Sequence, residues 1–515
     1  MRQARNTPAW PFPGPASFRH PDTARSPPSF RLSGRPFPIP SLLSPLSARK
    51  TAAAPRLSLS QLLSAMSYAL DLTEGQTPGH VLRSCAIGMR LAEGLGLDAQ
   101  ERSALYYALL LKDAGCSNNA ARVASLFGAD DFAVKRTFKL IDWQDRARLA
   151  MTAFGIVGRG RAIGARFALL FNLARTPGVT REMIDIRCHR GAGIARRMGF
   201  PGPTADAIQS LDEHWNGAGH PAGLRGDAIP RMARICSLAQ TVEVFHASQG
   251  VEAAIDMARH RRGTWFDPRL VDLLCDIRGD WAWWEELATP GLIGAVVALE
   301  PAAHERTIGM DELDVVAQAF GEIIDAKSPY TFQHSANVAS YAAGIAAQVG
   351  MSPDGLRSIA RAGLLHDIGK LGVSNLILDK NGPLTPGERR TVEQHPIYTY
   401  EILTRVDAFR SFARTAALHH ERLDGSGYPW RLNGNALVRE ARILAVADVY
   451  EALTAERPYR AAMEPARAFD IIARDAGTRL DAQIVEALHA HVAGTQPRVS
   501  SSRTVTAAPS SAAVL

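Results

Sequence analysis

The chain has few cysteines, no long apolar run and little strand-like alternation. Its five cysteines are scattered among 515 residues without any CxxC spacing. This argues against a disulfide framework and a zinc ribbon, and fits a reducing compartment such as the cytoplasm. The longest apolar run, 292–299, is far shorter than the roughly 20 residues that span a bilayer. We therefore predict no membrane insertion.

Positive charge is concentrated at one end of the chain. The net charge is +7, but residues 1–56 alone hold eight Arg and one Lys against one Asp, or +8, which leaves −1 (7 − 8) for the rest. No basic folded domain is indicated, so neither DNA nor RNA is an expected partner. Residues 1–56 are rich in Pro, Ser and Arg without apolar periodicity, which predicts a disordered tail. This tail resembles an organelle transit peptide, or else it reflects an over-extended start codon. Residues 494–515 are predicted to form a second disordered tail.

Between the tails the apolar pattern is helical. Val338, Tyr341 and Ile345 follow His334 at helical spacing, which predicts one apolar stripe on a helix. Residues 316–323 show the same spacing in the preceding segment. Glycine and proline cluster at 372–387 and 424–434, where we expect loops.

A long internal repeat divides the helical part. Residues 77–116 match 331–370 at a constant offset of 254 (331 − 77), and 216–221 match 424–429 at an offset of 208 (424 − 216). A repeat of this length indicates duplicated domains and not a solenoid. We predict an all-α chain with two tandem helical bundle domains, the first repeat (57–278) and the second repeat (309–493), joined by a Trp-rich connector (279–308).

The second repeat contains an ordered set of residues of the types that bind metals. Neutral imidazole and carboxylate are both ligands for divalent transition metals. One carboxylate interrupts the apolar run 443–447, where burial without a partner would be unfavourable. Each histidine alone is better explained as a hydrogen-bonded core or surface residue, but the set in one domain favours a metal centre. Its members are His334, His366, Asp367, His395, His419, His420 and Asp448.

The first repeat provides an internal control, because it lacks most of these groups. At the positions predicted to correspond, it has His80, Lys112, Asp113, His189, Leu211, Asp212 and Gln240. A helical bundle of this type therefore does not need the full set to fold. We predict that the first repeat cannot hold the same metal centre and is non-catalytic. It is either a structural support or a pseudo-enzyme that acts in dimerisation or regulates its neighbour.

Residues 309–493 resemble the HD-GYP family, a branch of the HD superfamily of metal-dependent phosphohydrolases. The resemblance rests on Ser-Pro-Tyr-Thr at 328–331, His-Asp-Ile-Gly-Lys at 366–370 and Gly-Pro-Leu-Thr at 382–385. It also rests on the stretch 419–429, which ends in Gly-Tyr-Pro, and on Arg-Pro-Tyr-Arg at 457–460. A His-Asp pair alone is a weak signal, whereas this ordered set is specific.

The resemblance implies a role for each matching residue. All seven members of the set would bind two divalent ions, iron or manganese, with Asp367 bridging them and acting in catalysis together with Lys370. Lys370 would neutralise charge on the scissile phosphate. Tyr330 stands where members with three metals have Glu, so two metals are expected, and Thr399 replaces a frequent Gly with little expected effect. The implied substrate-binding residues are Lys370, Gly427, Tyr428, Pro429, Arg457 and Arg460.

The implied function is hydrolysis of the bacterial second messenger cyclic di-GMP to pGpG or GMP, through attack by a hydroxide that bridges the metals. One alternative is an HD phosphohydrolase that acts on another cyclic dinucleotide or nucleotide. A second is a non-catalytic regulator or scaffold that binds a cyclic dinucleotide. A homodimer and signalling protein partners are compatible with either reading.

Overall fold

Helices dominate the computed structural model, which describes residues 57–142, 145–159, 161–175, 178–456 and 461–495. Within these ranges the two strands, β1 (Leu57–Ser58) and β2 (Thr307–Ile308), pair antiparallel. The predicted all-α class is confirmed. The predicted tail 1–56 lies outside the described residues, as does the second predicted tail from residue 496 on, while residues 494 and 495 of that tail end the last helix.

The first repeat consists of twelve α-helices, α2 to α13, and two short 3-10 helices within its described residues. They are α2 (Leu59–Glu74), α3 (His80–Gly94), α4 (Ala99–Leu111), η1 (Cys116–Asn119), α5 (Ala120–Phe127), α6 (Asp131–Lys139), α7 (Arg146–Ile156), α8 (Ile163–Arg175), α9 (Val179–Arg197), α10 (Gly202–Gln209), η2 (Gly226–Ala228), α11 (Arg231–Gln249), α12 (Val251–His260) and α13 (Pro268–Asp276). The connector is itself helical, with α14 (Trp281–Glu286), α15 (Leu292–Val297) and η3 (Ala302–His304). Trp284 is buried there, and α15 packs on α2 and α3.

The second repeat repeats the order of long helices in a shorter form. Its elements are α16 (Met310–Asp325), α17 (His334–Gln348), α18 (Pro353–Leu365), η4 (Ile368–Gly372), α19 (Asn375–Leu378), α20 (Pro386–Val392), α21 (His395–Thr404), η5 (Asp407–Phe409), α22 (Arg410–Ala417), η6 (Gly434–Ala436), α23 (Arg439–Thr454), α24 (Pro465–Asp475) and α25 (Ala482–Thr495). The stripe expected after His334 lies on α17, where Val338 and Ile345 are fully buried. The segment 372–387 is a loop as expected, apart from the single turn of α19 and the start of α20.

Local sequence explains where α18, the helix that leads to His366-Asp367, begins. Ser352 accepts a hydrogen bond from the backbone N–H of Gly355, and Pro353 opens α18. These are favoured N-cap and first-turn residues.

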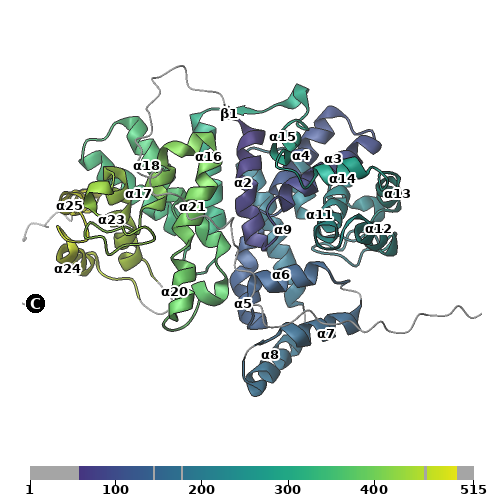
Figure 1. The fold of residues 1–515 in the computed structure, drawn as a ribbon, viewed down its shortest axis with the longest axis horizontal. Coiled ribbons are helices and arrows are strands. Elements are labelled where there is room, and N and C mark those ends of the chain that lie inside the picture. The colour runs from purple at the N-terminus through teal and green to yellow at the C-terminus, as the bar shows by residue number, and fades with distance from the viewer. Residues whose placement is uncertain (1–56, 143–144, 160, 176–177, 457–460, 496–515) are drawn as a thin grey trace, which may run out of the picture. The chain divides into compact units, whose positions relative to one another are not determined.

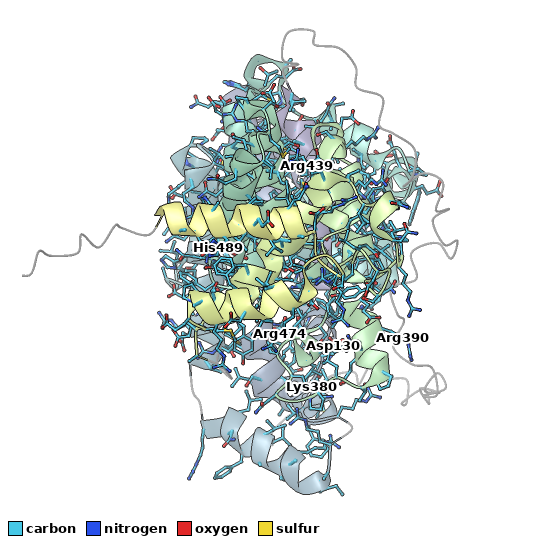
Figure 2. The ribbon with its side chains drawn as sticks, turned by 90° about the vertical axis from the view of Figure 1, so that its left-hand side faces the viewer. Asp130, Lys380, Arg390, Arg439, Arg474 and His489 are labelled. Atoms are coloured by element: carbon cyan, nitrogen blue, oxygen red, sulfur yellow. The ribbon has the colours of Figure 1, made fainter. Side chains whose placement is uncertain are left out.

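At the other end of this repeat α24 and α25 lie side by side (Figure 2). The rings of Phe469 and His489 meet between them with centroids 4.9 Å apart, so a ring contact holds the last helix in place.

Helix α2 contacts both repeats (Figure 1). It packs on α3 and α15 and also on η4 and α21 of the second repeat. It is buried along nearly its whole length, including the polar stripe formed by Ser60, Ser64, Ser67, Asp71 and Glu74. The helix that begins the first repeat therefore also supports the elements that follow the His-Asp pair.

Candidate metal centre

The seven predicted ligands come from three helices and from the ends of two others, and the structure brings them together. His334 is the first residue of α17 and His395 the first of α21. His366-Asp367 lies between α18 and η4, His419-His420 follows α22, and Asp448 lies within α23. All are buried except His420, which is partly exposed.

The donor atoms form two groups that meet at one carboxylate. Asp367, His395, His419 and His420 form one group, and His334, His366 and Asp448 the other; in each, the donor atoms lie within 4.8 Å of one another. Oδ1 of Asp367 is 3.3 Å from Nε2 of His395 and 3.6 Å from Nε2 of His419. Its Oδ2 is 3.5 Å from Nε2 of His334 and 3.4 Å from Nε2 of His366. Each oxygen of Asp367 thus faces a different group, as a bridging ligand does.

Three of the imidazoles are oriented by backbone carbonyls. Nδ1 of His366, His395 and His419 donates to the carbonyl oxygen three residues earlier, at 2.7, 2.7 and 2.6 Å. A proton held on Nδ1 leaves Nε2 of a neutral imidazole as a bare acceptor. In all three rings Nε2 is the atom that faces Asp367, so each ring presents a metal-binding nitrogen to the centre.

Glu451 orients the fourth ring and was not predicted from the sequence. Its carboxylate is buried and bonds Nδ1 of His334. Carboxylate partners of this kind fix the tautomer of a metal-binding histidine. A signal was present, because Glu451 lies three residues after Asp448 on the same helix, and Glu243 occupies the matching place in the first repeat at the offset of 208.

The residues present fit a pair of divalent cations. Nε2 of His366 and Oδ1 of Asp367 are buried and have no hydrogen-bond partner among the described residues, which is the state expected of atoms reserved for a metal. Burial lowers the pKa of His419 to about 4, so this ring is a neutral ligand. Burial also lowers the pKa of His334, but the carboxylates of Asp367 and Glu451 outweigh it and raise that pKa to about 10. The second group therefore attracts positive charge.

Lys370 and Gly369 follow the pair on η4. Nζ of Lys370 is 2.5 Å from Oδ2 of Asp367, and its side chain is about one quarter exposed (24%). Burial alone would raise the pKa of Asp367, but the Lys370 ammonium and the His366 imidazole hold it well below its usual range. A Cβ on Gly369 would lie 1.9 Å from the carbonyl oxygen of His395. Only glycine allows η4 and α21 to approach this closely.

The Gly-Tyr-Pro loop is held over the centre by a buried carboxylate. Glu421 accepts hydrogen bonds from the backbone N–H groups of Trp430, Arg431 and Leu432 at 2.8, 3.2 and 2.9 Å. The Tyr428 ring lies beside the His420 ring with centroids 4.6 Å apart. Tyr428, one of the loop residues named by the resemblance, therefore lies against a predicted ligand. Arg457 and Arg460 lie outside the described residues.

Thr399 forms more contacts than expected. Its hydroxyl accepts from the Gly369 N–H at 3.0 Å and donates to the His366 carbonyl oxygen at 2.8 Å. It is fully buried. The residue that replaces the frequent glycine therefore ties α21 to the His-Asp segment.

In the first repeat a lysine takes the place of a metal-facing histidine. Lys112 is buried; its Nζ lies 3.0 Å from Nε2 of His80 and also contacts Asp113. Glu243 bonds Nδ1 of His80, as Glu451 bonds His334. A fixed ammonium thus supplies the positive charge that the buried Asp113 needs.

The predicted correspondence between His189 and His395 is wrong. A Cβ on Gly115 would lie 2.0 Å from the carbonyl oxygen of Arg187, just as one on Gly369 would meet His395. Arg187 therefore takes the place of His395, while His189 is largely exposed. The offset of 208 that relates the later parts of the two repeats gives Arg187 directly (395 − 208), so the prediction was out of register by two residues after the insertion.

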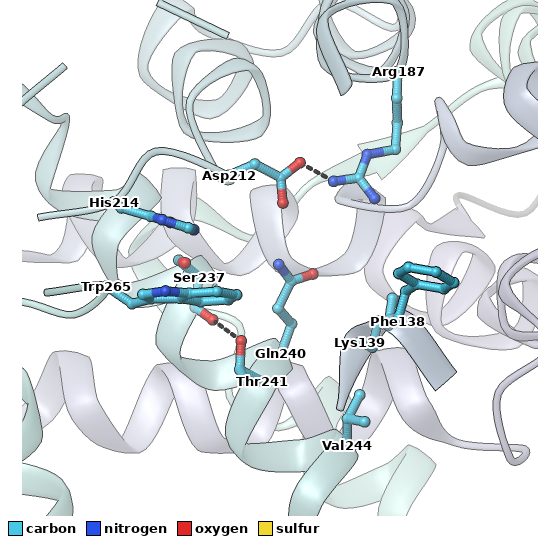
Figure 3. A pocket seen from close by; sticks show the side chains of 10 residues that line it. All are labelled: Phe138, Lys139, Arg187, Asp212, His214, Ser237, Gln240, Thr241, Val244 and Trp265. Carbon is cyan, nitrogen blue, oxygen red and sulfur yellow. Dashed lines mark hydrogen bonds and ion pairs between the residues drawn. The ribbon is translucent and has the colours of Figure 1, made fainter. Parts of the chain in front are cut away.

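Arg187 forms an ion pair with Asp212, which corresponds to His420 (Figure 3). The cavity around them is also lined by Gln240, the counterpart of Asp448, and by Lys139. The His214 ring stacks on Trp265 with centroids 4.0 Å apart. In this part of the first repeat, an internal ion pair occupies positions that correspond to predicted ligands of the second repeat.

Comparison with known proteins gives one family and a relative that matches both repeats. The HD domain family model matches residues 178–270 and 318–484. The 3'3'-cGAMP-specific phosphodiesterase 3 of Vibrio cholerae is 41% identical over 434 residues, which are 84% of this chain and 94% of that protein. The crystal structure of a cyclic GMP-AMP specific phosphodiesterase of V. cholerae matches with a TM-score of 0.59 and 36% identity, over 86% of this chain and 99% of that one.

A further relative matches over a shorter range. The cyclic di-GMP phosphodiesterase response regulator of Xanthomonas campestris is 41% identical over 154 residues, which are 29% of this chain and 40% of that protein. The likeness to the first relative therefore extends over most of both chains, whereas the likeness to this one covers less than half of either.

Proposed function

Because the chain belongs to the HD-GYP branch of the HD domain family, we propose that it is a metal-dependent phosphodiesterase that opens 3'3'-cGAMP to a linear dinucleotide. The choice of 3'3'-cGAMP as the substrate rests on how much of the chain each relative matches. The cGAMP-specific relative matches over 84% of this chain. The relatives named for cyclic di-GMP match over 27–37% of it. Cyclic di-GMP, expected from the sequence, becomes the second substrate to test.

The metals proposed are two iron or manganese ions, held by the seven ligands. Five imidazoles with two carboxylates suit first-row transition metals better than Mg²⁺ or Ca²⁺, which prefer oxygen ligands. When bound, two such ions supply a water nucleophile at neutral pH and stabilise the charge of an in-line displacement. Asp367 would bridge the ions, and Glu451 would keep Nε2 of His334 free to bind.

The protein's own residues would position the phosphodiester beside the metals. The Lys370 ammonium lies next to Asp367 and is partly exposed, so it would stabilise negative charge that develops on the phosphate oxygens. Tyr428 would form the wall of the site over His420. Arg457 and Arg460 stay predicted phosphate-binding residues.

The test compares His366→Ala with His189→Ala, a histidine of the first repeat that is exposed and outside both ligand groups. We expect His366→Ala to lower bound metal and to reduce turnover of 3'3'-cGAMP by roughly a thousandfold or more, while His189→Ala retains both. Metal content by elemental analysis and product by chromatography check this. Unchanged turnover in His366→Ala would contradict the enzyme assignment.

The same assay tests the choice of substrate independently of the phosphodiesterase activity. We expect a higher kcat/KM for 3'3'-cGAMP than for cyclic di-GMP. The opposite order would refute the proposed substrate and leave the phosphodiesterase in place. Tight binding of either nucleotide by metal-loaded protein without turnover would instead support the non-catalytic regulator.

The remaining expectations stay proposals. The two repeats are proposed to be separate domains, the first without catalytic activity, and a homodimer and signalling partners stay untested. The five cysteines form no disulfide, which supports a reducing compartment such as the cytoplasm.

A further inference from the structure

Helices α7 and α8 form an addition that the second repeat lacks. The offset between the repeats falls from 254 to 208 between residues 116 and 187, so the first repeat has 46 extra residues there (254 − 208). In Figure 1 the two helices lie at the lower end of the ribbon, next to α5 and α6. Since the second repeat folds without them, their surface is not required by the bundle.

The inner face of this hairpin is packed. Leu169 and Leu173 of α8 and Ile156 of α7 pack against the cluster around Phe127 and Val157. Arg166 of α8 ties the two helices together, since its guanidinium donates to the carbonyl oxygens of Phe154 and Val157. The hairpin is therefore held in a defined orientation.

The outer face of the hairpin presents large apolar side chains to solvent. Of the nine exposed large hydrophobic side chains among the described residues, five lie here, with exposed fractions of 55–73%. They are Met151, Phe154, Ile163, Phe167 and Phe171. On α8 they follow the spacing i, i+4, i+8, which places them in one stripe. An exposed apolar stripe of this kind marks an interaction surface.

The charge around the stripe is of one sign. Residues 146–175 contain six arginines and no acidic residue. Arg148, Arg159, Arg161 and Arg175 are exposed and form no ion pair within the described part of the chain. The Arg175 guanidinium lies over the Phe171 ring at 4.2 Å. Arg175 therefore borders the apolar stripe, and the four exposed arginines of this segment leave their charges for a partner.

This charge argues against two partners that the chain itself offers, the same face of a second copy and residues 1–56. A second copy that placed the same face on this one would bring two arginine-rich surfaces together. Residues 1–56 carry +8 and would be repelled in the same way. The partner must carry negative charge and accept several large apolar side chains at once.

We propose that the outer face of α7 and α8 docks on the surface of an anionic phospholipid bilayer. A helix with an apolar stripe bordered by arginines lies in the interface, with its apolar side chains among the acyl chains and its guanidiniums at the headgroup phosphates. Such contact does not require a span: none of the described helices has both the length and the apolar character to cross a bilayer. Docking would hold the protein at a membrane surface through its first repeat.

The test uses the full chain and sedimentation with vesicles of phosphatidylcholine, with or without phosphatidylglycerol. We expect binding only to the vesicles with the anionic lipid, and its loss as salt rises from about 0.1 M to about 1 M. The double variant Phe167→Ser/Phe171→Ser and the double variant Arg159→Glu/Arg161→Glu should each lower the partition coefficient about tenfold or more.

A matched control replaces exposed apolar residues elsewhere. Ile293→Ser/Val315→Ser changes side chains that are exposed on α15 and α16 and should leave vesicle binding unchanged. Circular dichroism checks that every variant is folded, so the result does not depend on turnover.

Three results would overturn the proposal. One is failure of the parent protein to bind anionic vesicles. Another is binding that the Phe167→Ser/Phe171→Ser variant retains, since charge alone would then explain it. The last is a fall in molar mass by light scattering in that variant, which would identify the face as a contact between copies.

Discussion

At the scale of the residue, a buried acid is retained in both repeats, and the cation that compensates it differs. Asp113 and Asp367 occupy the same place, and both are almost fully buried. Asp113 contacts the Lys112 ammonium, whereas Asp367 faces imidazoles on both of its oxygens. A buried carboxylate needs positive charge close by. Both repeats place a lysine beside this acid, Lys112 in the first and Lys370 in the second, but only in the second do imidazoles also face both carboxylate oxygens.

Substitution of Glu451 tests whether the carboxylate that bonds Nδ1 of His334 strengthens metal binding by that ring. We expect Glu451→Gln to weaken metal binding by about 10- to 100-fold, because the amide holds the His334 ring less firmly and makes it less basic. Metal titration of the protein and turnover at limiting metal check this.

The matched control is Glu243→Gln, which removes the corresponding carboxylate from His80 in the first repeat. It should leave metal affinity unchanged at temperatures where the protein is folded. Equal loss of metal affinity in both variants would indicate a general effect of instability and would contradict the role assigned to Glu451.

At the scale of the element, one carboxylate sets the start of the helix that carries the first histidine. Asp325 accepts from the N–H and hydroxyl of Ser335 on α17. Asp71, at the offset of 254, accepts from the N–H groups of Gly79 and Val81 at 2.6 and 2.9 Å. Such bonds satisfy N–H groups at a helix start that otherwise lack partners. The same device orients α3 and α17, with or without a metal centre.

Asp71 also gives a pH dependence of stability. Burial raises the pKa of Asp71 to about 7, and the N–H groups of Val81 and Gly79 only partly oppose this. A carboxyl whose pKa is higher in the folded state stabilises that state at low pH, and this contribution is lost as pH rises from about 4 to about 7. We expect Asp71→Asn to remove this contribution to the fall in the free energy of unfolding between about pH 4 and about pH 7.

The measurement is the free energy of unfolding by urea at several pH values between about 4 and 8. The difference between the parent and Asp71→Asn should change by up to a few kcal/mol across that window, in favour of the variant at the higher pH. A difference that does not vary with pH would show that Asp71 ionises in the folded protein as it does in the unfolded chain.

At the scale of the whole molecule, the two repeats share a buried polar contact. Asp131 of α6 is fully buried and accepts from the Ser374 hydroxyl at 3.0 Å and the Asn375 N–H at 2.9 Å. The buried Lys327 ammonium lies 3.6 Å from the same carboxylate. Ser374 and Asn375 follow η4, which carries Lys370. The first repeat therefore supports the segment that bears a predicted catalytic residue.

We expect Asp131→Ala to lower the free energy of unfolding by roughly 3–5 kcal/mol, because it leaves a buried ammonium without its partner. Turnover should also fall, since the segment after η4 loses two hydrogen bonds. Urea unfolding and steady-state kinetics on the full chain check both effects. The control is Asp130→Ser, which retains a capping side chain at the start of α6. The two variants having equal stability would contradict the role of Asp131.

The sequence by itself determined the all-α class, the repeat and the seven residues that the structure brings together as candidate ligands. These follow from local patterns: helical spacing, a constant offset and residue types with known ligand chemistry. His334 and His366 were found because their types and order carry the chemistry wherever the chain places them.

Only the tertiary structure decided which atoms face one another. It showed that the Glu451 carboxylate bonds His334, and that Asp131 of the first repeat bonds Ser374 and Asn375 of the second. It also showed α2 packed on both repeats and left Phe167 and Phe171 exposed. Each of these depends on contacts between segments far apart in the chain. Spacing along the chain does not predict such contacts, because it does not say which helix faces pack against one another.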